Sequence, residues 1–145
     1  MRIAIGSDHA GFTLKRALVA HLLAGQHDVV DLGTHSTDAV DYPDFGAAVG
    51  RAVAGHDADL GVCVCGSGIG IAIAANKVPG VRAATVHDVT SARLAREHNN
   101  ANVVCVGERL IGPVVATEAL DAFLDAKFQG GRHQGRVAKI DALLQ

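Results

Sequence analysis

Residues 65–70 (CGSGIG) combine a thiol, a hydroxyl and three alternating glycines. Alternating glycines let the backbone turn tightly and aim several N–H groups at one point, which suits an anion or a developing oxyanion. A thiol at the mouth of such a turn is favoured as the thiolate, the reactive form of cysteine. The segment therefore indicates thiolate chemistry beside an anion-binding turn, or only a tight strand–helix turn with a buried cysteine behind it.

Known glycine-rich loops fit this segment poorly. A dinucleotide fingerprint needs G-x-G-x-x-G and the order here is G-x-G-x-G, although Asp88 lies about 20 residues on, where a ribose-binding acid would stand. A P-loop needs a lysine and a hydroxyl residue after its glycines, and a cysteine phosphatase loop needs arginine where Ile71 stands. Cys63 and Cys65 are one residue too close for a C-x-x-C redox pair.

Asp8 and His9 form a second candidate, directly after the first apolar run. An Asp–His pair at the end of a strand is suited to hold a sugar hydroxyl and an anion together. Asp8, or Ser7 before it, is equally a natural N-cap for the helix that follows. Capping leaves His9 without a role, so the pair favours a binding function.

Basic side chains supply two further candidates. His98 ends a helix-like segment and is a natural general acid or base near neutral pH, although such a histidine is often only a favourable contact with the helix dipole. Arg132 and Arg136 are four residues apart in a glycine-rich stretch, and Arg109 follows another strand. Converging guanidinium groups suit phosphate, so we expect an anion site rather than solvated surface charge.

Composition excludes several classes of protein. A net charge of −2 gives no basic footprint for nucleic acid, and 49% hydrophobic residues exclude a disordered chain. We expect no membrane span, because no apolar run reaches about 20 residues, and no signal peptide at the N-terminus. Three cysteines without a framework spacing predict a reducing compartment, the cytoplasm. The eight histidines show no metal-ligand spacing, so we expect no metal.

Short β-branched runs that alternate with helix-like segments must position these side chains. The alternation predicts one domain over residues 1–145, with a three-layer α/β/α, Rossmann-like fold around a five-stranded parallel sheet. Ligands of such sheets bind beyond the carboxyl ends of the strands, where Asp8, Cys65 and Arg109 fall. The expected strands are 2–6, 28–32, 60–65, 82–86 and 103–106, and the expected helices are 13–23, 43–54, 69–76, 89–98, 113–126 and 134–144.

Six segments, read together and in order, point to one family. They are residues 6–12 (GSDHAGF), 41–43 (DYP), 65–71 (CGSGIGI), 76–77 (NK), 96–99 (REHN) and 130–137 (GGRHQGRV). The chain resembles the type B ribose-5-phosphate isomerases, a family grouped with the isomerases of allose and galactose phosphates. Any one segment is a loose match, whereas six in order over nearly the whole chain are specific.

The resemblance implies that the protein interconverts D-ribose 5-phosphate and D-ribulose 5-phosphate, in the pentose phosphate pathway, through a cis-enediolate and without a metal or other cofactor. Cys65 matches the base that moves the proton between C2 and C1, and His98 matches the residue that opens the furanose ring, with Asp8 holding the sugar. The backbone amides of residues 66–70, with the Ser67 side chain, match the anion hole. The other substrate-binding positions that the family implies are Gly66, Gly68, Ile69, Gly70, Tyr42, Asn99, and, around the phosphate, His9, Arg109, Arg132 and Arg136.

One departure from the family pattern and two alternative functions qualify this reading. Some members use a glutamate base instead of the cysteine. Ile71, beside the glycine turn here, cannot act as an acid or base, which leaves Cys65 as the candidate. Ser67 replaces the threonine common in cysteine-type members and keeps the hydroxyl. The resemblance also implies a dimer or tetramer with shared active sites, in which residues 129–145 pack near the neighbouring subunit. The alternatives are an isomerase of a six-carbon phosphate such as D-allose 6-phosphate, and a non-catalytic module that binds a nucleotide or a sugar phosphate.

Overall fold

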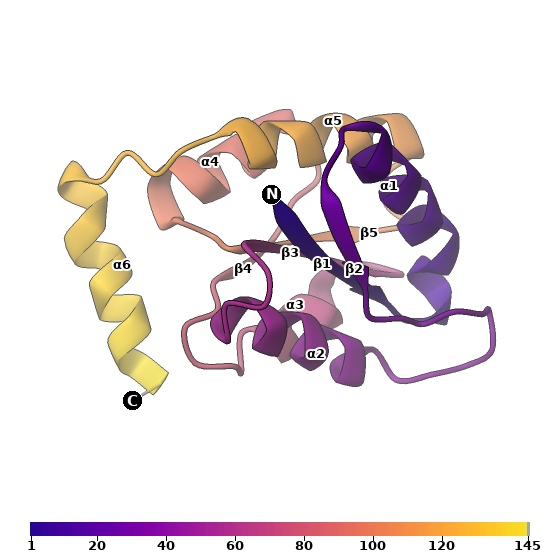
Figure 1. The fold of residues 1–145 in the computed structure, drawn as a ribbon. Coiled ribbons are helices and arrows are strands. Elements are labelled where there is room, and N and C mark those ends of the chain that lie inside the picture. Colours follow the sequence, from indigo (N-terminus) through magenta and orange to yellow (C-terminus); the bar gives the residue numbers. More distant parts are fainter. Residues whose placement is uncertain (145) are drawn as a thin grey trace.

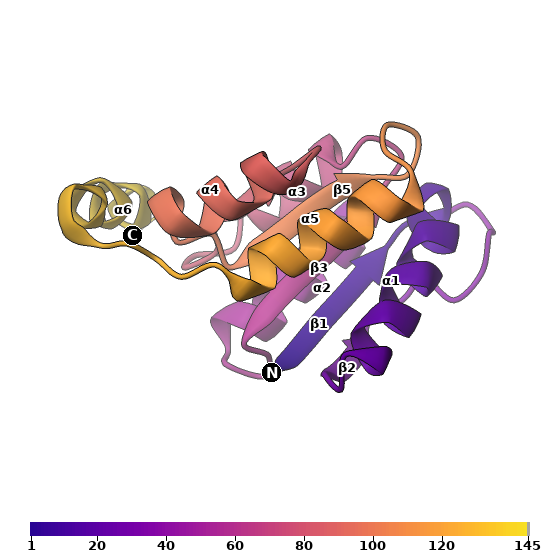
Figure 2. The same cartoon turned by 90° about the horizontal axis from the view of Figure 1, so that it is seen from above.

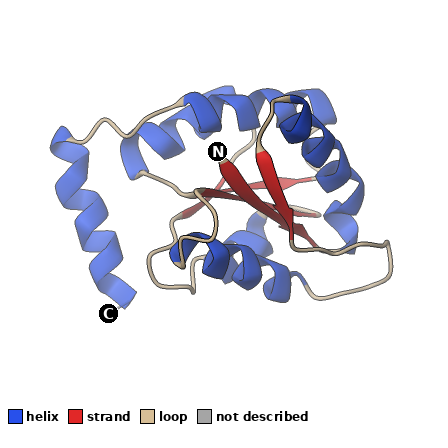
Figure 3. Ribbon diagram, in the orientation of Figure 1, coloured by secondary structure: helices blue, strands red, loops and turns tan. Residues whose placement is uncertain are grey.

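The computed structural model describes residues 1–144 and contains one parallel sheet with helices on both faces (Figures 1 and 3). The strand order is β2-β1-β3-β5-β4. Strands β1, β3 and β5 lie in the middle and are almost wholly buried, because their continuous apolar runs have no face that suits water. The strands are β1 (Arg2–Ser7), β2 (Asp28–Asp31), β3 (Leu60–Cys65), β4 (Ala83–Thr85) and β5 (Val103–Gly107).

The helices form two layers, each of which buries an apolar core against one face of the sheet. One core contains Leu14, Leu18 and Leu22, which lie four residues apart on one face of α1, together with residues of α4 and α5. The other core lies under α2 and α3 and contains the cysteine side chains. The helices of residues 1–144 are α1 (Phe12–Ala24), α2 (Tyr42–Ala54), α3 (Ile69–Ala75), α4 (Val89–Asn99), α5 (Pro113–Asp125) and α6 (Gln134–Asp141).

The structure confirms the predicted fold class and places each predicted element within a few residues of its expected bounds. The largest shift is at the C-terminal end. The predicted helix 134–144 is α-helical only as far as Asp141, and a 3-10 turn follows at Ala142–Leu144. The strand predicted at 82–86 is shorter by one residue at each end and spans Ala83–Thr85; before it, the backbone N–H of Arg82 bonds to the side chain of Asn102.

Helix α6 stands apart from both layers in Figures 1 and 2. An ion pair of 2.7 Å between Arg82 and Asp141 fastens its end to the rest of the molecule. Val137 is buried, but Ile140 is 42% exposed and Leu143, in the turn that follows, is 80% exposed. We predicted that residues 129–145 pack near a neighbouring subunit. The structure of a single chain does not test this, so it stays a prediction. Gln145 itself lies outside the described residues.

Because all five strands are parallel, their carboxyl ends all lie at one end of the sheet and their amino ends at the other. Chain segments that leave a strand start at the carboxyl end, and a helix that leads into the next strand returns to the amino end. Segments 7–11, 65–70 and 107–110 leave β1, β3 and β5 and so share one end. The last turn of α4, which leads into β5, lies at the other end (Figure 2).

Candidate active site

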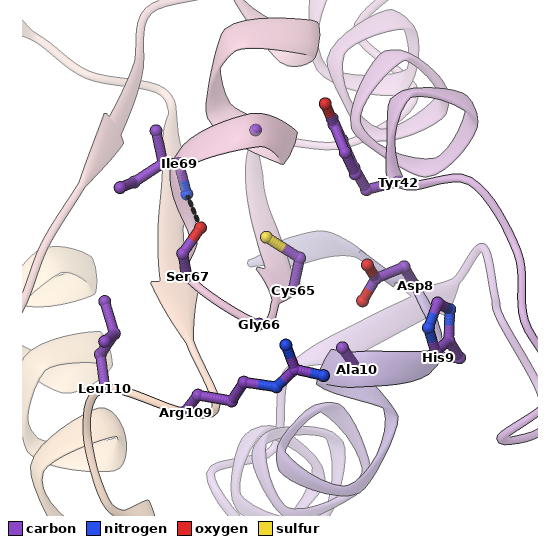
Figure 4. A pocket seen from close by; sticks show the side chains of 11 residues that line it. Asp8, His9, Ala10, Tyr42, Cys65, Gly66, Ser67, Ile69, Arg109 and Leu110 are labelled. Atoms are coloured by element: carbon purple, nitrogen blue, oxygen red, sulfur yellow. Dashed lines mark hydrogen bonds between the residues drawn. The ribbon is translucent and has the colours of Figure 1, made fainter.

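A cavity of about 540 Å³ opens at the carboxyl end of the sheet (Figure 4). The loops after β1, β3 and β5 and the first turn of α2 form its walls. This is the position expected for a ligand of a parallel α/β sheet. Its lining residues are Asp8, His9, Ala10, Tyr42, Cys65, Gly66, Ser67, Ile69, Gly70, Arg109 and Leu110.

Cys65 ends β3 and lines the cavity although only 4% of the residue is exposed. Figure 4 shows its sulfur near the middle of the ring of labelled side chains. The backbone N–H of Gly68 donates a hydrogen bond of 3.1 Å to Sγ. A donor aimed at sulfur stabilises negative charge there, as a thiolate base requires.

Gly68 makes this turn possible. Its φ of +75° lies in the left-handed region, and α3 starts at the next residue. A Cβ at this position would lie 2.8 Å from the carbonyl carbon of Val106, which belongs to β5. The hydroxyl of Thr85 donates to the Gly68 carbonyl at 2.9 Å and fixes the outer side of the turn.

Not all amides of the turn are equally available for an oxyanion. The N–H of Gly68 bonds to the Cys65 sulfur, and the N–H of Ile69 bonds to Ser67 Oγ at 3.2 Å. The amides of Gly66, Ser67 and Gly70 are therefore the stronger candidates for binding a substrate oxygen. Ile69 contributes its side chain to the cavity wall.

Replacing Gly68 by alanine is expected to reduce both stability and activity. A left-handed non-glycine residue costs about 1–2 kcal/mol, and the contact with Val106 must also be relieved. Gly80 is the matched control, because its φ is +81° but a Cβ there meets nothing within 4 Å. Thermal unfolding and kcat should show a loss of stability in both variants and a loss of activity only in Gly68→Ala. Equal activity in the two variants would contradict the role of the turn.

The structure confirms the capping role of Asp8, and its binding role stays a prediction for a side chain that lines the cavity. It caps the 3-10 turn His9–Gly11 by accepting the N–H of Gly11 at 3.0 Å. It is also only 6% exposed, and Figure 4 shows its carboxylate beside the cavity. His9 Nδ1 lies 3.2 Å from both the N and the O of Val40, so it ties the long loop before α2 to the cavity wall.

Arg109 lines the cavity from the loop after β5. Its backbone N–H bonds to the carbonyl of Gly66 at 3.0 Å, and its guanidinium group lies against the same residue. On the facing wall the ring of Tyr42 lies across Gly70, where a Cβ would approach the ring to 2.7 Å. The cavity thus has a cation on one wall and an aromatic hydroxyl on another.

Glu108 is a residue of the site region that the sequence analysis did not identify. Its N–H bonds to the Cys65 carbonyl at 2.9 Å, and its carboxylate accepts the N–H of Leu14 at 2.9 Å. It thereby joins the Arg109 loop to the cysteine turn and to the start of α1. Its only signal in the sequence is an acidic side chain between a strand end and an arginine.

The structure does not bring the remaining predicted residues to this cavity within one chain. His98 lies in the last turn of α4, with its ring stacked on that of His133 at 4.3 Å and 10°. Arg132 and Arg136 belong to the turn and helix beside it. Asn99 lines a separate cavity of about 390 Å³ that also touches β4 and α6. The cause is topological, because α4 returns to the amino end of the sheet.

Two pKa values outside the cavity have clear causes. Burial, and then the charges of His98, Arg132 and Arg136, lower the pKa of His133. Hydrogen bonding to Cys63, followed by burial, raises the pKa of the Cys105 thiol. Cys63 and Cys105 are fully buried partners on neighbouring strands and do not line the cavity. Within residues 1–144, Cys65 is thus the one cysteine that borders it.

Asp88 does not support the dinucleotide interpretation. Its carboxylate caps α4 by accepting the N–H of Ser91 at 2.7 Å, in a reciprocal capping box. That hydrogen bond lowers the pKa of Asp88.

In residues 1–144 no three His, Cys, Asp or Glu side chains are grouped so that they could hold a metal ion. Nor does any helix in that range have the length and apolar character to cross a membrane.

Fold and site together define an α/β protein with a cysteine, a carboxylate and a guanidinium group around one cavity at the carboxyl end of a parallel sheet. Residues 3–140 match the Ribose/Galactose Isomerase family. The chain belongs to this family, and the resemblance noted from the sequence is thereby confirmed.

Individual relatives agree with this assignment over nearly their whole length. The chain is 46% identical to the ribose-5-phosphate isomerase B of Escherichia coli K12 over 144 residues, which cover 99% of this chain and 97% of the relative. The structure of the Clostridium thermocellum ribose-5-phosphate isomerase B superimposes with a TM-score of 0.98, at 50% identity and with 99% and 97% coverage. The Mycoplasma genitalium enzyme, solved with bound ribulose-5-phosphate, gives a TM-score of 0.93 at 47% identity, with 98% and 95% coverage.

Proposed function

We propose that this protein is an aldose–ketose isomerase that interconverts D-ribose 5-phosphate and D-ribulose 5-phosphate. The observation that carries the proposal is that the Cys65 sulfur and the Arg109 guanidinium group line one cavity beside a glycine turn. Relatives named for this activity match the chain over nearly its full length, which supports the same substrate.

The geometry suits proton transfer next to a carbonyl group. The Cys65 thiolate removes the proton from C2 of the open-chain aldose, and the electron pair moves to the carbonyl oxygen at C1 to give an enediolate. Cys65 then returns the proton to C1, the proton of the C2 hydroxyl passes to the C1 oxygen, and the C2 oxygen becomes that of the ketone. Amides of Gly66, Ser67 and Gly70, with the Ser67 hydroxyl, stabilise the oxyanion, and Asp8 holds a sugar hydroxyl. Preorganised donors of this kind act most strongly when charge develops on the oxygen.

A second copy of the chain completes the site in this proposal. His98, Asn99, Arg132 and Arg136 lie at the amino end of the sheet and do not line the cavity of their own chain. A dimer, or a tetramer built from dimers, brings this cluster to the cavity of the neighbouring subunit. There His98 opens the sugar ring, Asn99 contacts the sugar, and both arginines join His9 and Arg109 around the phosphate.

Because the three cysteines are free and buried, we place the protein in a reducing compartment, the cytoplasm.

A six-carbon sugar phosphate is the second candidate substrate, because the family includes galactose isomerases. Measuring kcat/KM for D-ribose 5-phosphate and for D-allose 6-phosphate separates the two. We expect the pentose to be the better substrate by at least about tenfold, since one misplaced carbon in a fitted site costs about 1–3 kcal/mol. A higher kcat/KM for the hexose would reverse the assignment. Nucleotide binding without turnover of either sugar would favour the non-catalytic alternative.

Removing a phosphate-binding arginine should weaken substrate binding more than turnover. Arg136→Ala is expected to raise KM by about tenfold to a hundredfold, because a charge-assisted hydrogen bond contributes about 1.5–3 kcal/mol. Lys139→Ala, three residues further along α6, is the matched control, since it removes a positive charge that the proposal does not use. Steady-state kinetics with ribose 5-phosphate measures both. A KM like that of the wild type in Arg136→Ala would contradict the phosphate role.

His98→Asn should impair ring opening and spare proton transfer. D-ribulose 5-phosphate cannot form a five-membered ring, because phosphate occupies its 5-hydroxyl, so exchange of its C1 proton in D₂O needs only the base. We expect net conversion of ribose 5-phosphate to fall by about a hundredfold, while C1 exchange followed by proton NMR stays near the wild-type rate. Equal losses in the two measurements would remove the ring-opening role from His98.

A further inference from the structure

Beside the proposed catalytic residues the structure holds a histidine that no step above uses. His133 is only 7% exposed, although it lies in a short turn whose neighbours Arg132 and Gln134 are exposed. Its ring stacks on the ring of His98 with the centroids 4.3 Å apart and the planes 10° from parallel. A buried polar ring in face-to-face contact with a proposed acid–base residue requires an explanation.

The backbone is arranged so as to deliver His133 to that position. The N–H of Gln129 bonds to the carbonyl of Glu97 at 3.0 Å, which fixes the segment after α5 to the last turn of α4, next to His98. Gly130 and Gly131 follow with φ of +63° and +53°, two consecutive left-handed residues that side chains would strain. The N–H of His133 then closes the turn on the Gly130 carbonyl at 3.0 Å.

We infer that His133 is a positioning residue of the proposed isomerase, whose ring holds the ring of His98 by stacking in the orientation needed to open the sugar. This inference rests on the proposed function, because only that function gives His98 a role. His133 itself touches no substrate in this account. It acts through His98, and its contact with Arg132 places the ring-opening residue and the phosphate-binding residues in one unit.

The charges around the pair give the two rings different tasks. Arg132 Nε points to His133 Nε2 at 3.4 Å, an arrangement in which Nε2 accepts and which favours the neutral ring. Burial and the charges of His98, Arg132 and Arg136 keep the pKa of His133 below its ordinary value, which favours the same neutral form. A neutral ring beside His98 does not compete for the proton that His98 transfers. Rotation of the His98 ring is restricted because one of its faces is covered.

Two substitutions separate stacking from simple volume. His133→Phe keeps a flat ring and the buried volume, whereas His133→Ala removes the ring. We expect His133→Ala to lower net conversion of ribose 5-phosphate by about tenfold to a hundredfold and to leave C1 exchange of ribulose 5-phosphate within about threefold of wild type. His133→Phe should stay within about threefold in both measurements. His56→Asn, an exposed histidine with φ of +61° at the turn before β3, is the control.

Histidine NMR provides a readout that stability alone would not move. Loss of the stacked ring should shift the Cε1–H resonance of His98 in His133→Ala, while His133→Phe should keep a ring-current shift. An unchanged His98 resonance in His133→Ala would overturn the contact, and wild-type turnover despite a shifted resonance would overturn the positioning role. Equal impairment of the Phe and Ala variants would also overturn stacking as the cause. Wild-type protein without isomerase activity would instead refute the proposed function, and the resonance test of the contact would still stand.

Discussion

Cys65→Ala is expected to abolish isomerisation and to leave binding of a sugar phosphate nearly intact. Removing a general base lowers kcat by about 10²–10⁴, and no other thiol of the chain lines the cavity to replace Cys65. The proposed phosphate contacts lie away from the reacting carbons, so they should survive the substitution. Turnover is measured in a coupled assay with ribose 5-phosphate. Binding is measured by calorimetry with D-ribitol 5-phosphate, which has no carbonyl group and cannot react.

Cys63→Ala is the matched control for this result. Cys63 lies on the same strand and contributes to the same core as Cys65, but it is fully buried opposite Cys105 of β5. Its loss should lower stability by about 1 kcal/mol and leave kcat unchanged. If Cys65→Ala turned over ribose 5-phosphate at the wild-type rate, the thiolate would have no role as base. Equal losses in the two variants would point to damage of the core instead.

The fold followed from the sequence because its strands are short, continuous apolar runs separated by helices with clear stripes. Lys15 shows where such reasoning stops. A lysine within a helix is expected to face water, yet Lys15 is 1% exposed, with its Nζ 2.5 Å from Asp31 Oδ1. The partner lies at the end of β2, and only the packing of α1 on that edge of the sheet brings the two charges together. No local pattern in the sequence carries that information.

The candidate site, too, could be predicted only in part from local sequence patterns. The strand-end rule alone places Asp8, Cys65 and Arg109 at one end of the sheet, and the structure brings all three to one cavity. The residues themselves suggested His98 as an acid–base group and Arg136 as part of an anion site, but only the family resemblance assigned both to the same site as Cys65. The topology of a single chain sends them to the opposite end, because α4 runs back before β5 begins. One sequence does not show which surface of a second copy meets the cavity.

Shared active sites predict that two inactive chains restore activity when they assemble. One chain carries Cys65→Ala and keeps the His98 cluster, while the other carries His98→Asn with Arg136→Ala and keeps the cysteine. In a mixed dimer one of the two sites contains all three substitutions. The other site contains none of them, because it combines Cys65 of one chain with His98 and Arg136 of its partner. The mixed dimer should therefore regain about half of the wild-type activity, since one of its two symmetric sites is intact.

Co-expression with two different affinity tags isolates that mixed dimer, and the coupled assay with ribose 5-phosphate measures its turnover. The control pairs Cys65→Ala with a chain that carries all three substitutions, a combination in which neither site keeps its cysteine. Only the first pair should be active, because restoration needs the intact groups to come from different chains. Were each site built from a single chain, both mixed dimers would remain inactive. That result would overturn the sharing of active sites between subunits, which is proposed because the cavity lined by Cys65 does not include His98 of its own chain.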